Sequence, residues 1–164
     1  MTAKFNKRKI TSISKINQTT IWISLEGRIN GEPGQFVMVW LPNIGEKPFS
    51  IAQFNPLGLM VVNVGPFSHA VHQLNVGDSV WIKGPLGRGF TIDGERLLLV
   101  GGGYGSAPLL PLAIEARANQ KKVNVFIGAK SKNDLLLLTA FQDLGCEVTV
   151  TTEDGTSGEK GLVT

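Results

Sequence analysis

Hydrophobic and polar positions follow two different patterns along this chain of 164 residues. Up to about residue 93, short runs rich in β-branched and aromatic residues alternate with turn signals such as Asn30-Gly31, which indicates strands. These runs are residues 21–25, 36–40, 59–64 and 79–83. Short strands at this spacing predict a barrel or a sandwich. One short helix is expected at residues 68–74, with Ser68 as its N-cap.

From Arg96 the pattern changes to that of a parallel α/β domain. Residues 97–100 are continuously apolar, which is typical of a strand buried on both faces. Further elements are expected as a helix at 107–119, a strand at 123–127, a helix at 134–144 capped by Asn133 or Asp134, and a strand at 147–151. We therefore predict two domains, 1–93 and 94–164. Three strands are few for a nucleotide-binding domain, so we expect the second to be incomplete at its C-terminus.

Composition and charge exclude several classes of protein. A hydrophobic content of 42% with 18% charged residues predicts a globular chain, and a net charge of +3 is too weak to indicate nucleic acid. The single cysteine, Cys146, excludes an internal disulfide and fits a reducing, cytoplasmic compartment. The uncharged stretch 97–114 is nearly long enough for a membrane helix, but its glycines and prolines favour a strand, a turn and a helix start. No membrane span and no metal site are expected.

A glycine-rich turn at residues 100–108, VGGGYGSAP, is the main candidate for a binding site. A strand that leads through glycines into a helix N-terminus binds anions, because backbone N–H groups and the helix dipole face the ligand. The turn departs from the dinucleotide fingerprint, since Pro108 stands where the third glycine belongs. The next strand also ends in Gly128-Ala-Lys130 rather than in an acidic residue. A tight turn without a ligand is the alternative.

A second candidate is the extended segment 47–51, KPFSI. Lys47 would pair with a phosphate, and Pro48 would fix the backbone. Ser50 lies on the same strand face as Pro48 and would donate to a heterocycle. The alternative is a strand edge with a solvated lysine.

Taken in order, these segments resemble the ferredoxin–NADP reductase superfamily. The resemblance rests on PGQF at 33–36, KPFS at 47–50, VGPFSHAV at 64–71, GPLG at 84–87 and then the glycine turn. Residues 84–90, 100–113, 127–130 and 152–164 also resemble the electron-transfer subunits of dihydroorotate dehydrogenase. Related NADH:ferredoxin oxidoreductase and sulfhydrogenase subunits share several of these motifs.

This resemblance implies an antiparallel, six-stranded, FAD-binding barrel followed by an NAD-binding α/β domain. Lys47 falls at the family's usual arginine, which binds the flavin pyrophosphate, and a lysine keeps the charge but loses the bidentate fork. The cofactor-binding residues so implied are Lys47, Pro48, Phe49, Ser50 and Ile51 around the flavin, Val64, Gly65 and Ser68 at its ring and phosphates, Gly102, Gly103, Gly105 and Pro108 at the NAD pyrophosphate, and Glu153 and Asp154 at the adenosine ribose.

The implied function is electron transfer between NAD(H), FAD and an iron–sulfur or flavin partner, which would be the dihydroorotate-oxidising catalytic subunit of pyrimidine biosynthesis in a hetero-oligomer. No catalytic side chain is expected. The family's four-cysteine motif for a two-iron two-sulfur cluster is absent from the 164 residues, so the chain is either truncated or of a shorter design. Alternatives are a free-standing NAD(P)H:ferredoxin or flavin reductase, a sulfhydrogenase-type subunit, and a non-catalytic flavin-binding fragment. NADH versus NADPH stays open.

Overall fold

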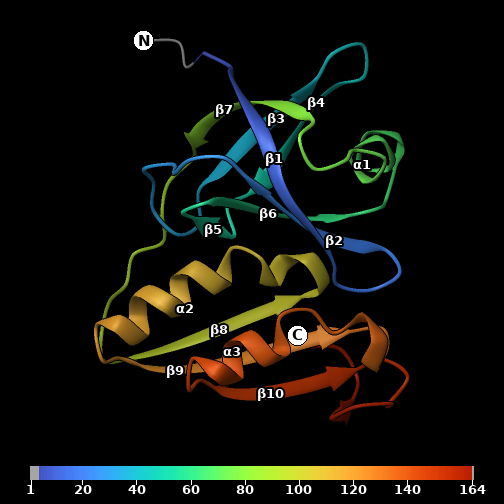
Figure 1. Cartoon of the computed structure of the whole chain (residues 1–164). Helices are drawn as coiled ribbons and strands as arrows, with labels where there is room; N and C mark the ends of the chain where they lie inside the picture. Colours follow the sequence, from blue (N-terminus) through green and yellow to red (C-terminus); the bar gives the residue numbers. More distant parts are fainter. Residues whose placement is uncertain (1–3, 164) are drawn as a thin grey trace. The chain divides into compact units, whose positions relative to one another are not determined.

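The computed structural model describes residues 4–163, which form two compact units, one up to Gly89 and one from Phe90 onward (Figure 1). The division falls close to the domain boundary proposed at 93/94, which stays a prediction. The ends of both proposed domains, residues 1–3 and 164, lie outside the described residues, and so does the last residue of the 152–164 stretch.

The first unit is built on one antiparallel sheet of seven strands. In chain order they are β1 (Asn6–Lys15), β2 (Thr20–Leu25), β3 (Phe36–Leu41), β4 (Gly45–Ser50), β5 (Gln53–Phe54), β6 (Leu57–Val62) and β7 (Ser79–Leu86). They lie in the order β4-β3-β7-β1-β2-β6-β5, and β4 also comes into contact with β6, so the sheet curls round its core. The expected antiparallel architecture is confirmed. The seventh strand is the two-residue β5.

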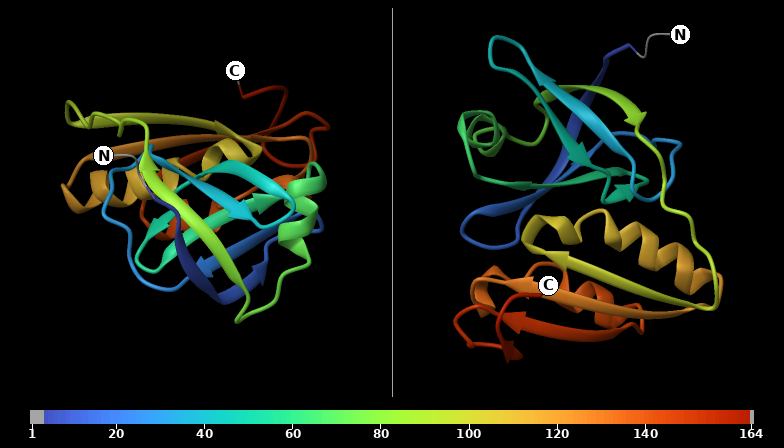
Figure 2. Two further views of the ribbon diagram at one scale, coloured as in Figure 1. Left: turned by 90° about the horizontal axis from the view of Figure 1, so that it is seen from above. Right: turned by 180° about the vertical axis from the view of Figure 1, so that it is seen from behind.

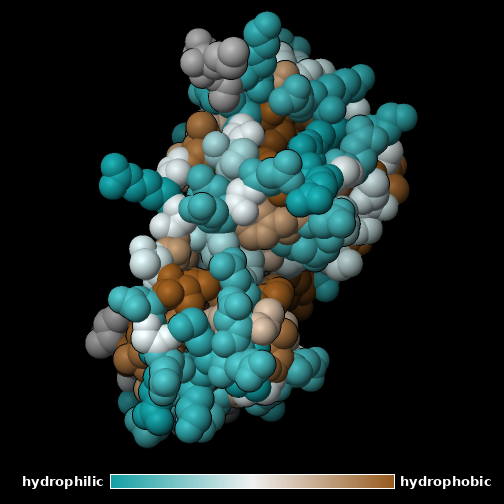
Figure 3. Space-filling view, turned by 90° about the vertical axis from the view of Figure 1, so that its left-hand side faces the viewer, coloured by the Kyte–Doolittle hydropathy of each residue, from teal (hydrophilic) through white to brown (hydrophobic). Residues whose placement is uncertain are grey.

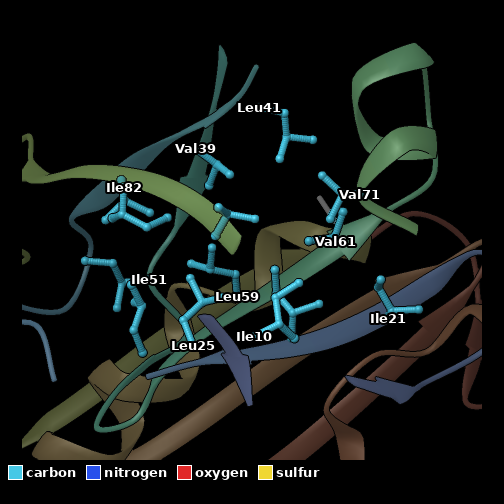
Figure 4. Close-up of a cluster of buried hydrophobic side chains, with 14 of the residues drawn as sticks. Ile10, Ile21, Leu25, Val39, Leu41, Ile51, Leu59, Val61, Val71 and Ile82 are labelled. Carbon is cyan, nitrogen blue, oxygen red and sulfur yellow. The ribbon is translucent and has the colours of Figure 1, made fainter. Parts of the chain in front are cut away.

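Side-chain alternation explains how the first-unit core forms. In β3, Val37, Val39 and Leu41 are buried while the residues between them are half-buried. The buried set joins Ile10, Leu59 and others in one apolar cluster (Figure 4). The polar strand β1 escaped prediction because only Ile10 of its ten residues is fully buried. Its extended form is imposed by pairing with β2 on one side and β7 on the other.

The helix α1 (Pro66–His72), green in Figure 2, begins two residues earlier than expected. Its N-cap is Gly65, and Pro66 occupies the first helical position, where a missing N–H costs nothing. The expectation that Ser68 caps the helix is wrong. Ser68 is the third helical residue, and its hydroxyl reaches back to the backbone at the cap.

The second unit is a parallel sheet with two α-helices, as expected. Its strands are β8 (Arg96–Gly102), β9 (Lys122–Ala129), β10 (Glu147–Thr152) and β11 (Glu159–Lys160), in the order β11-β10-β9-β8. The 3-10 helix η1 (Gly103–Ser106) precedes α2 (Leu109–Ala118), and η2 (Lys132–Asp134) precedes α3 (Leu138–Asp143). No helix in residues 4–163 is both long and apolar enough to span a membrane.

The prediction that residues 97–100 are buried on both faces is wrong. Leu99 is buried, but Leu98 and Val100 are 65% and 44% exposed. Both α-helices pack into the cluster that contains Leu99 and Val125, whereas Leu98 and Val100 lie on the opposite face of the sheet. Hydrophilic side chains cover most of the surface in Figure 3, and scattered apolar ones are ordinary. Leu98 and Val100 differ from these scattered residues because they are neighbours on the same face of the sheet.

The second predicted helix is also shorter than expected, and neither Asn133 nor Asp134 caps it. Asp134 ends η2, and α3 starts only after Leu137, whose φ of 62° breaks the helical path. The four consecutive leucines at 135–138 do not have the spacing of apolar residues that marks one face of a helix. Leu136 is buried although it lies outside the helix, and the helix begins only after this segment. Gly145, with a φ of +71°, ends the helix as predicted.

Replacing either of two exposed glutamines with glycine should change the stability of the protein, but in opposite directions. Gln120 follows α2 with a φ of 60°, whereas Gln142 lies inside α3. Gln120→Gly removes left-handed strain, so we expect the free energy of unfolding to rise by about 0.5–1 kcal/mol. Gln142→Gly should lower it by about 1 kcal/mol. Chemical denaturation of both variants measures this, and effects of the same sign would contradict the assignment.

Candidate cofactor-binding site

Strand pairing decides which way the 47–51 segment points. Lys47 lies opposite Val39 and Phe49 opposite Val37, both of which are core residues. Lys47 and Phe49 are therefore on the core side of β4, while Pro48 and Ser50 are on the outer side. Lys47 is exposed and Phe49 is half-buried.

A contact between aromatic rings joins this strand to α1. The ring centroids of Phe49 and Phe67 are 6.1 Å apart with an interplanar angle of 35°, a separation typical of attractive aromatic pairs. Because Phe67 is the second residue of α1, this contact brings the helix start beside the core side of β4. Two segments of the proposed flavin site, 47–51 and 64–68, thus lie together.

Ile51 is placed differently from a ligand-lining side chain. It is fully buried in the barrel core, and its N–H donates to the carbonyl of Gln35 at 3.0 Å. Any contact of residue 51 with a cofactor would have to be made by its main chain.

Gln35 is a positioning residue to which sequence reasoning gave no role. Besides holding the N–H of Ile51, its side chain accepts from the N–H of Glu32 at 2.8 Å and donates to the carbonyl of Gly87 at 3.0 Å. It therefore ties the end of β4 to the segment after β7. Its place in the PGQF motif was the available signal, but a motif does not show what a side chain bonds.

Ser68 uses its hydroxyl within the protein. The buried Oγ accepts from the N–H groups of Val64 at 2.9 Å and Gly65 at 3.0 Å, and donates to the Gly65 carbonyl at 3.0 Å. These bonds hold the entry to α1 in a fixed conformation. In this structure Ser68 shapes the loop that would meet a ligand.

The loop itself faces open space. Val64 is 77% exposed, and a Cβ built on Gly65 would meet no atom within 4 Å. The backbone of Gly65 is extended, a conformation open to any residue. Neither packing nor backbone strain therefore demands a glycine here, and the missing side chain leaves room for close approach by a ligand.

The glycines of the 100–108 turn have different reasons for being glycine. A Cβ on Gly101 would lie 2.8 Å from Leu109 Cδ1, so packing excludes a side chain, and Gly103 has a φ of +51°. Gly105 would meet nothing within 4 Å, and Gly102 only ordinary contacts at 3.8 Å and beyond. Turn geometry thus accounts for the first two glycines, while Gly102 and Gly105 leave room at the surface.

Pro108 and Tyr104 complete this turn. Pro108 is half-buried and occupies the N-cap position of α2, so it starts the helix. Tyr104 is 68% exposed at the tip of the turn, and sequence reasoning gave it no role. It is the chain's only tyrosine, so neither periodicity nor repetition could draw attention to it.

Glu153 and Asp154 lie in an ordered loop after β10. Hydrogen bonds from the Thr156 hydroxyl at 2.7 Å and its N–H at 2.9 Å lower the pKa of Asp154 below its ordinary value. The same hydroxyl accepts from the N–H of Lys132 at 2.8 Å, which ties the loop to η2. Glu153 is exposed beside this closed turn.

The two histidines and the cysteine do not form a catalytic or metal-binding site with one another. The ring of His72 bonds the Val61 carbonyl at 3.0 Å, and His69 lies against Asn63. Burial raises the pKa of the Cys146 thiol and so opposes thiolate formation, while the charge of Arg117 acts in the opposite direction and lowers the pKa. No group of three histidine, cysteine or acidic side chains within residues 4–163 is arranged to hold a metal ion.

Comparison with known structures defines the class of this fold. The chain superposes on an NADH-dependent reduced ferredoxin–NADP oxidoreductase with a TM-score of 0.85 at 28% identity, covering 94% of this chain and 59% of that one. A ferredoxin reductase of carbazole 1,9a-dioxygenase gives a TM-score of 0.84 at 20% identity, covering 96% and 54%. The architecture is that of ferredoxin–NADP reductase-like proteins. No protein-family model matches the chain.

Sequence comparison shows which members of this fold class the chain resembles. The chain is 42% identical over 132 residues to a probable dihydroorotate dehydrogenase B (NAD(+)) electron transfer subunit of Thermococcus kodakarensis, covering 80% of the chain and 55% of the relative. It is 40% identical over 159 residues to the same subunit of Methanothermobacter thermautotrophicus, covering 94% and 59%. The chain is a homologue of these electron transfer subunits, and it spans a little more than half their length.

Ser68 provides a test of the loop before α1. Ser68→Ala leaves the N–H groups of Val64 and Gly65 without their acceptor, so we expect the free energy of unfolding to fall by about 1–2 kcal/mol. Ser68→Thr keeps the hydroxyl and serves as the control. Thermal or chemical denaturation measures both, and an alanine variant as stable as the wild type would contradict the role given to these bonds.

Proposed function

We propose that the chain binds FAD with its first unit and NAD(H) with its second, as the electron-transfer component of a dihydroorotate dehydrogenase. The observation that carries this proposal is the identity of about 40% to electron transfer subunits of that enzyme, over stretches that include both units. The catalytic partner subunit, and with it a hetero-oligomer in pyrimidine biosynthesis, belongs to the same proposal. The lone cysteine supports a reducing, cytoplasmic compartment.

For the flavin, the residues present fit the cofactor. Lys47 would neutralise the pyrophosphate, and Phe49, Pro48 and Ser50 would lie along the ring, with residue 51 contributing its main chain. Val64 and Gly65 would meet the flavin where the loop faces open space. Ser68 would act indirectly, by holding that loop.

For the nicotinamide nucleotide, the same reasoning applies to the turn. Gly102 and Gly105 would admit the pyrophosphate close to the backbone, with Gly103 setting the turn and Pro108 starting α2. Asp154 already binds Thr156 with its carboxylate, so Glu153 is the better placed of the two for a ribose hydroxyl.

The bound cofactors would supply the redox chemistry, while the protein supplies binding and orientation. Hydride transfer between such cofactors needs no acid–base side chain, so the proposal assigns no catalytic residue. A two-iron two-sulfur cluster needs about four cysteine ligands, and the 164 residues contain one. No step through a cluster is therefore assigned to these residues.

A free-standing reductase is the second candidate. The likeness to the NADH-dependent ferredoxin–NADP oxidoreductase, at 28% identity, favours it. The two candidates differ in their partner: the first requires a complex with a dihydroorotate dehydrogenase catalytic subunit, and the second requires reduction of ferredoxin or free flavin by the chain alone.

The proposal is tested by purifying the chain, adding FAD and recording flavin absorbance, then adding NADH under anaerobic conditions. Bound flavin that is bleached by NADH supports it. A chain that takes up no FAD would refute it. Flavin that binds but is not reduced would instead favour a non-catalytic flavin-binding fragment.

Lys47 tests the phosphate contact. Lys47→Gln removes the charge, so we expect the Kd for FAD to rise roughly tenfold or more, in keeping with a lost charge-assisted hydrogen bond. Lys47→Arg restores a fork that matches phosphate and should lower the Kd below that of the wild type. Flavin fluorescence titration measures both, with Lys122→Gln, an exposed change in the second unit, as the control. Equal affinities in all four proteins would contradict the role of Lys47.

Two alanine variants of the glycine turn separate ligand binding from folding. Gly105→Ala meets no protein atom, so we expect stability to be unchanged and the affinity for NADH to fall at least several-fold. Gly101→Ala collides with Leu109 and should lower the free energy of unfolding by about 1–3 kcal/mol. Denaturation and NADH titration of each variant measure the two effects. A Gly105→Ala protein that binds NADH normally would count against a pyrophosphate at this position.

A further inference from the structure

A second surface of the first unit gathers tryptophans and lysines, and none of the proposed cofactor contacts uses it. It lies on the outer side of the half-sheet β4-β3-β7-β1, opposite the core. Strand register places Trp40 beside Trp81, Trp81 beside Lys7, and Met38 beside Lys83. Together with Phe5, these five side chains form what we call the aromatic face, whose members are Phe5, Lys7, Met38, Trp40, Trp81 and Lys83.

The rings of the aromatic face are packed against one another before any partner arrives. Trp40 and Trp81 meet edge to face with centroids 5.3 Å apart, and Phe5 lies 5.8 Å from Trp40. All three are only partly buried, so each keeps surface toward solvent. α1, the single helix in the described part of this unit, packs instead against β4 and β6.

Two lysines place positive charge directly on these rings. The Nζ of Lys7 lies 5.8 Å from the Trp81 ring centroid, and that of Lys83 lies 4.7 Å from the Phe5 ring, both within the range of cation–π attraction. The whole unit has the same sign. Nine of the chain's 16 lysines and arginines precede residue 90, against four of its 13 acidic residues.

A cross-strand aromatic pair stabilises a sheet by itself, but that role does not require cations above the rings or a surplus of positive charge. Tryptophan is enriched at the centre of protein interfaces, and charges of one sign around such a centre steer a partner of the opposite sign. The location is also relevant, because Met38 lies beside Pro48 of β4, the strand that carries the proposed flavin contacts. A protein bound here would be close to that strand.

We propose that the aromatic face is the docking surface for the redox partner, and that the partner offers an acidic surface around an apolar centre. This inference rests on the proposed function, in which the partner is the dihydroorotate dehydrogenase catalytic subunit. Charge complementarity would steer the encounter, and the prepacked rings would bury apolar area with little loss of side-chain freedom. An anionic membrane is the less favoured occupant, because these rings contact one another and are already partly buried.

The test measures binding of the flavin-loaded chain to the purified catalytic subunit of the same organism, by calorimetry at several ionic strengths. The double variant Lys7→Glu/Lys83→Glu changes charge on the aromatic face, and Trp40→Thr removes a ring while keeping a strand-forming residue. Lys122→Glu/Lys160→Glu makes the same charge change on exposed strand residues of the second unit. We expect at least a tenfold rise in Kd for both face variants, little change for the control, and weaker binding as salt increases.

Flavin absorbance and its bleaching by NADH are recorded for every variant, and both should match the wild type. Face variants that bind the catalytic subunit as tightly as the wild type would overturn the docking surface. A wild-type chain that does not bind that subunit would refute the proposed partner. Face variants that lose binding only to phosphatidylglycerol vesicles would also overturn it, in favour of a membrane. If Trp40→Thr fails to fold, the lysine pair decides alone. Failure to take up FAD would refute the proposed function instead, so the two failures are distinguishable.

Discussion

The pairing of β3 with β4 on one side and β7 on the other is the constraint on which the first unit depends. Because side chains alternate between the two faces of a strand, this register decides which residues enter the core and which face outward. Val37 and Val39 point inward, and their cross-strand partners Phe49 and Lys47 lie on the same side of the sheet. Trp40 points outward and meets Trp81. A slip of one residue would exchange the two sets.

Both surfaces to which we assign a role follow from that alternation. On the core side, Phe49 meets Phe67, and this contact brings the start of α1, with the loop of Val64 and Gly65 before it, to β4. On the outer side, the same strands bring together the tryptophans and lysines of the aromatic face. The core-side cofactor residues Lys47 and Phe49 and the proposed docking surface therefore lie on opposite sides of the same few strands.

In the second unit the ordering element is the transition from β8 through η1 to α2. Gly101 is required by packing under Leu109 and Gly103 by its positive φ, whereas Gly102 and Gly105 leave space unfilled. The motif by itself does not separate these reasons, because every glycine looks alike in a sequence. The exposure of Leu98 and Val100 is a second feature of this unit, since the strands of parallel sheets are usually buried on both faces.

The sequence by itself determined the two-part architecture, most of the strands, and the order of motifs that leads to the reductase superfamily. These features depend on local periodicity and on turn residues, which act over a few positions. Tertiary structure alone decided that polar β1 is a strand, because its pairing partners lie far away in the chain. It also decided that Ser68 holds a loop, that Ile51 is core, and that α3 starts after Leu137. Those outcomes depend on which distant atoms compete for each buried position, and such competition is not encoded in any short stretch of residues.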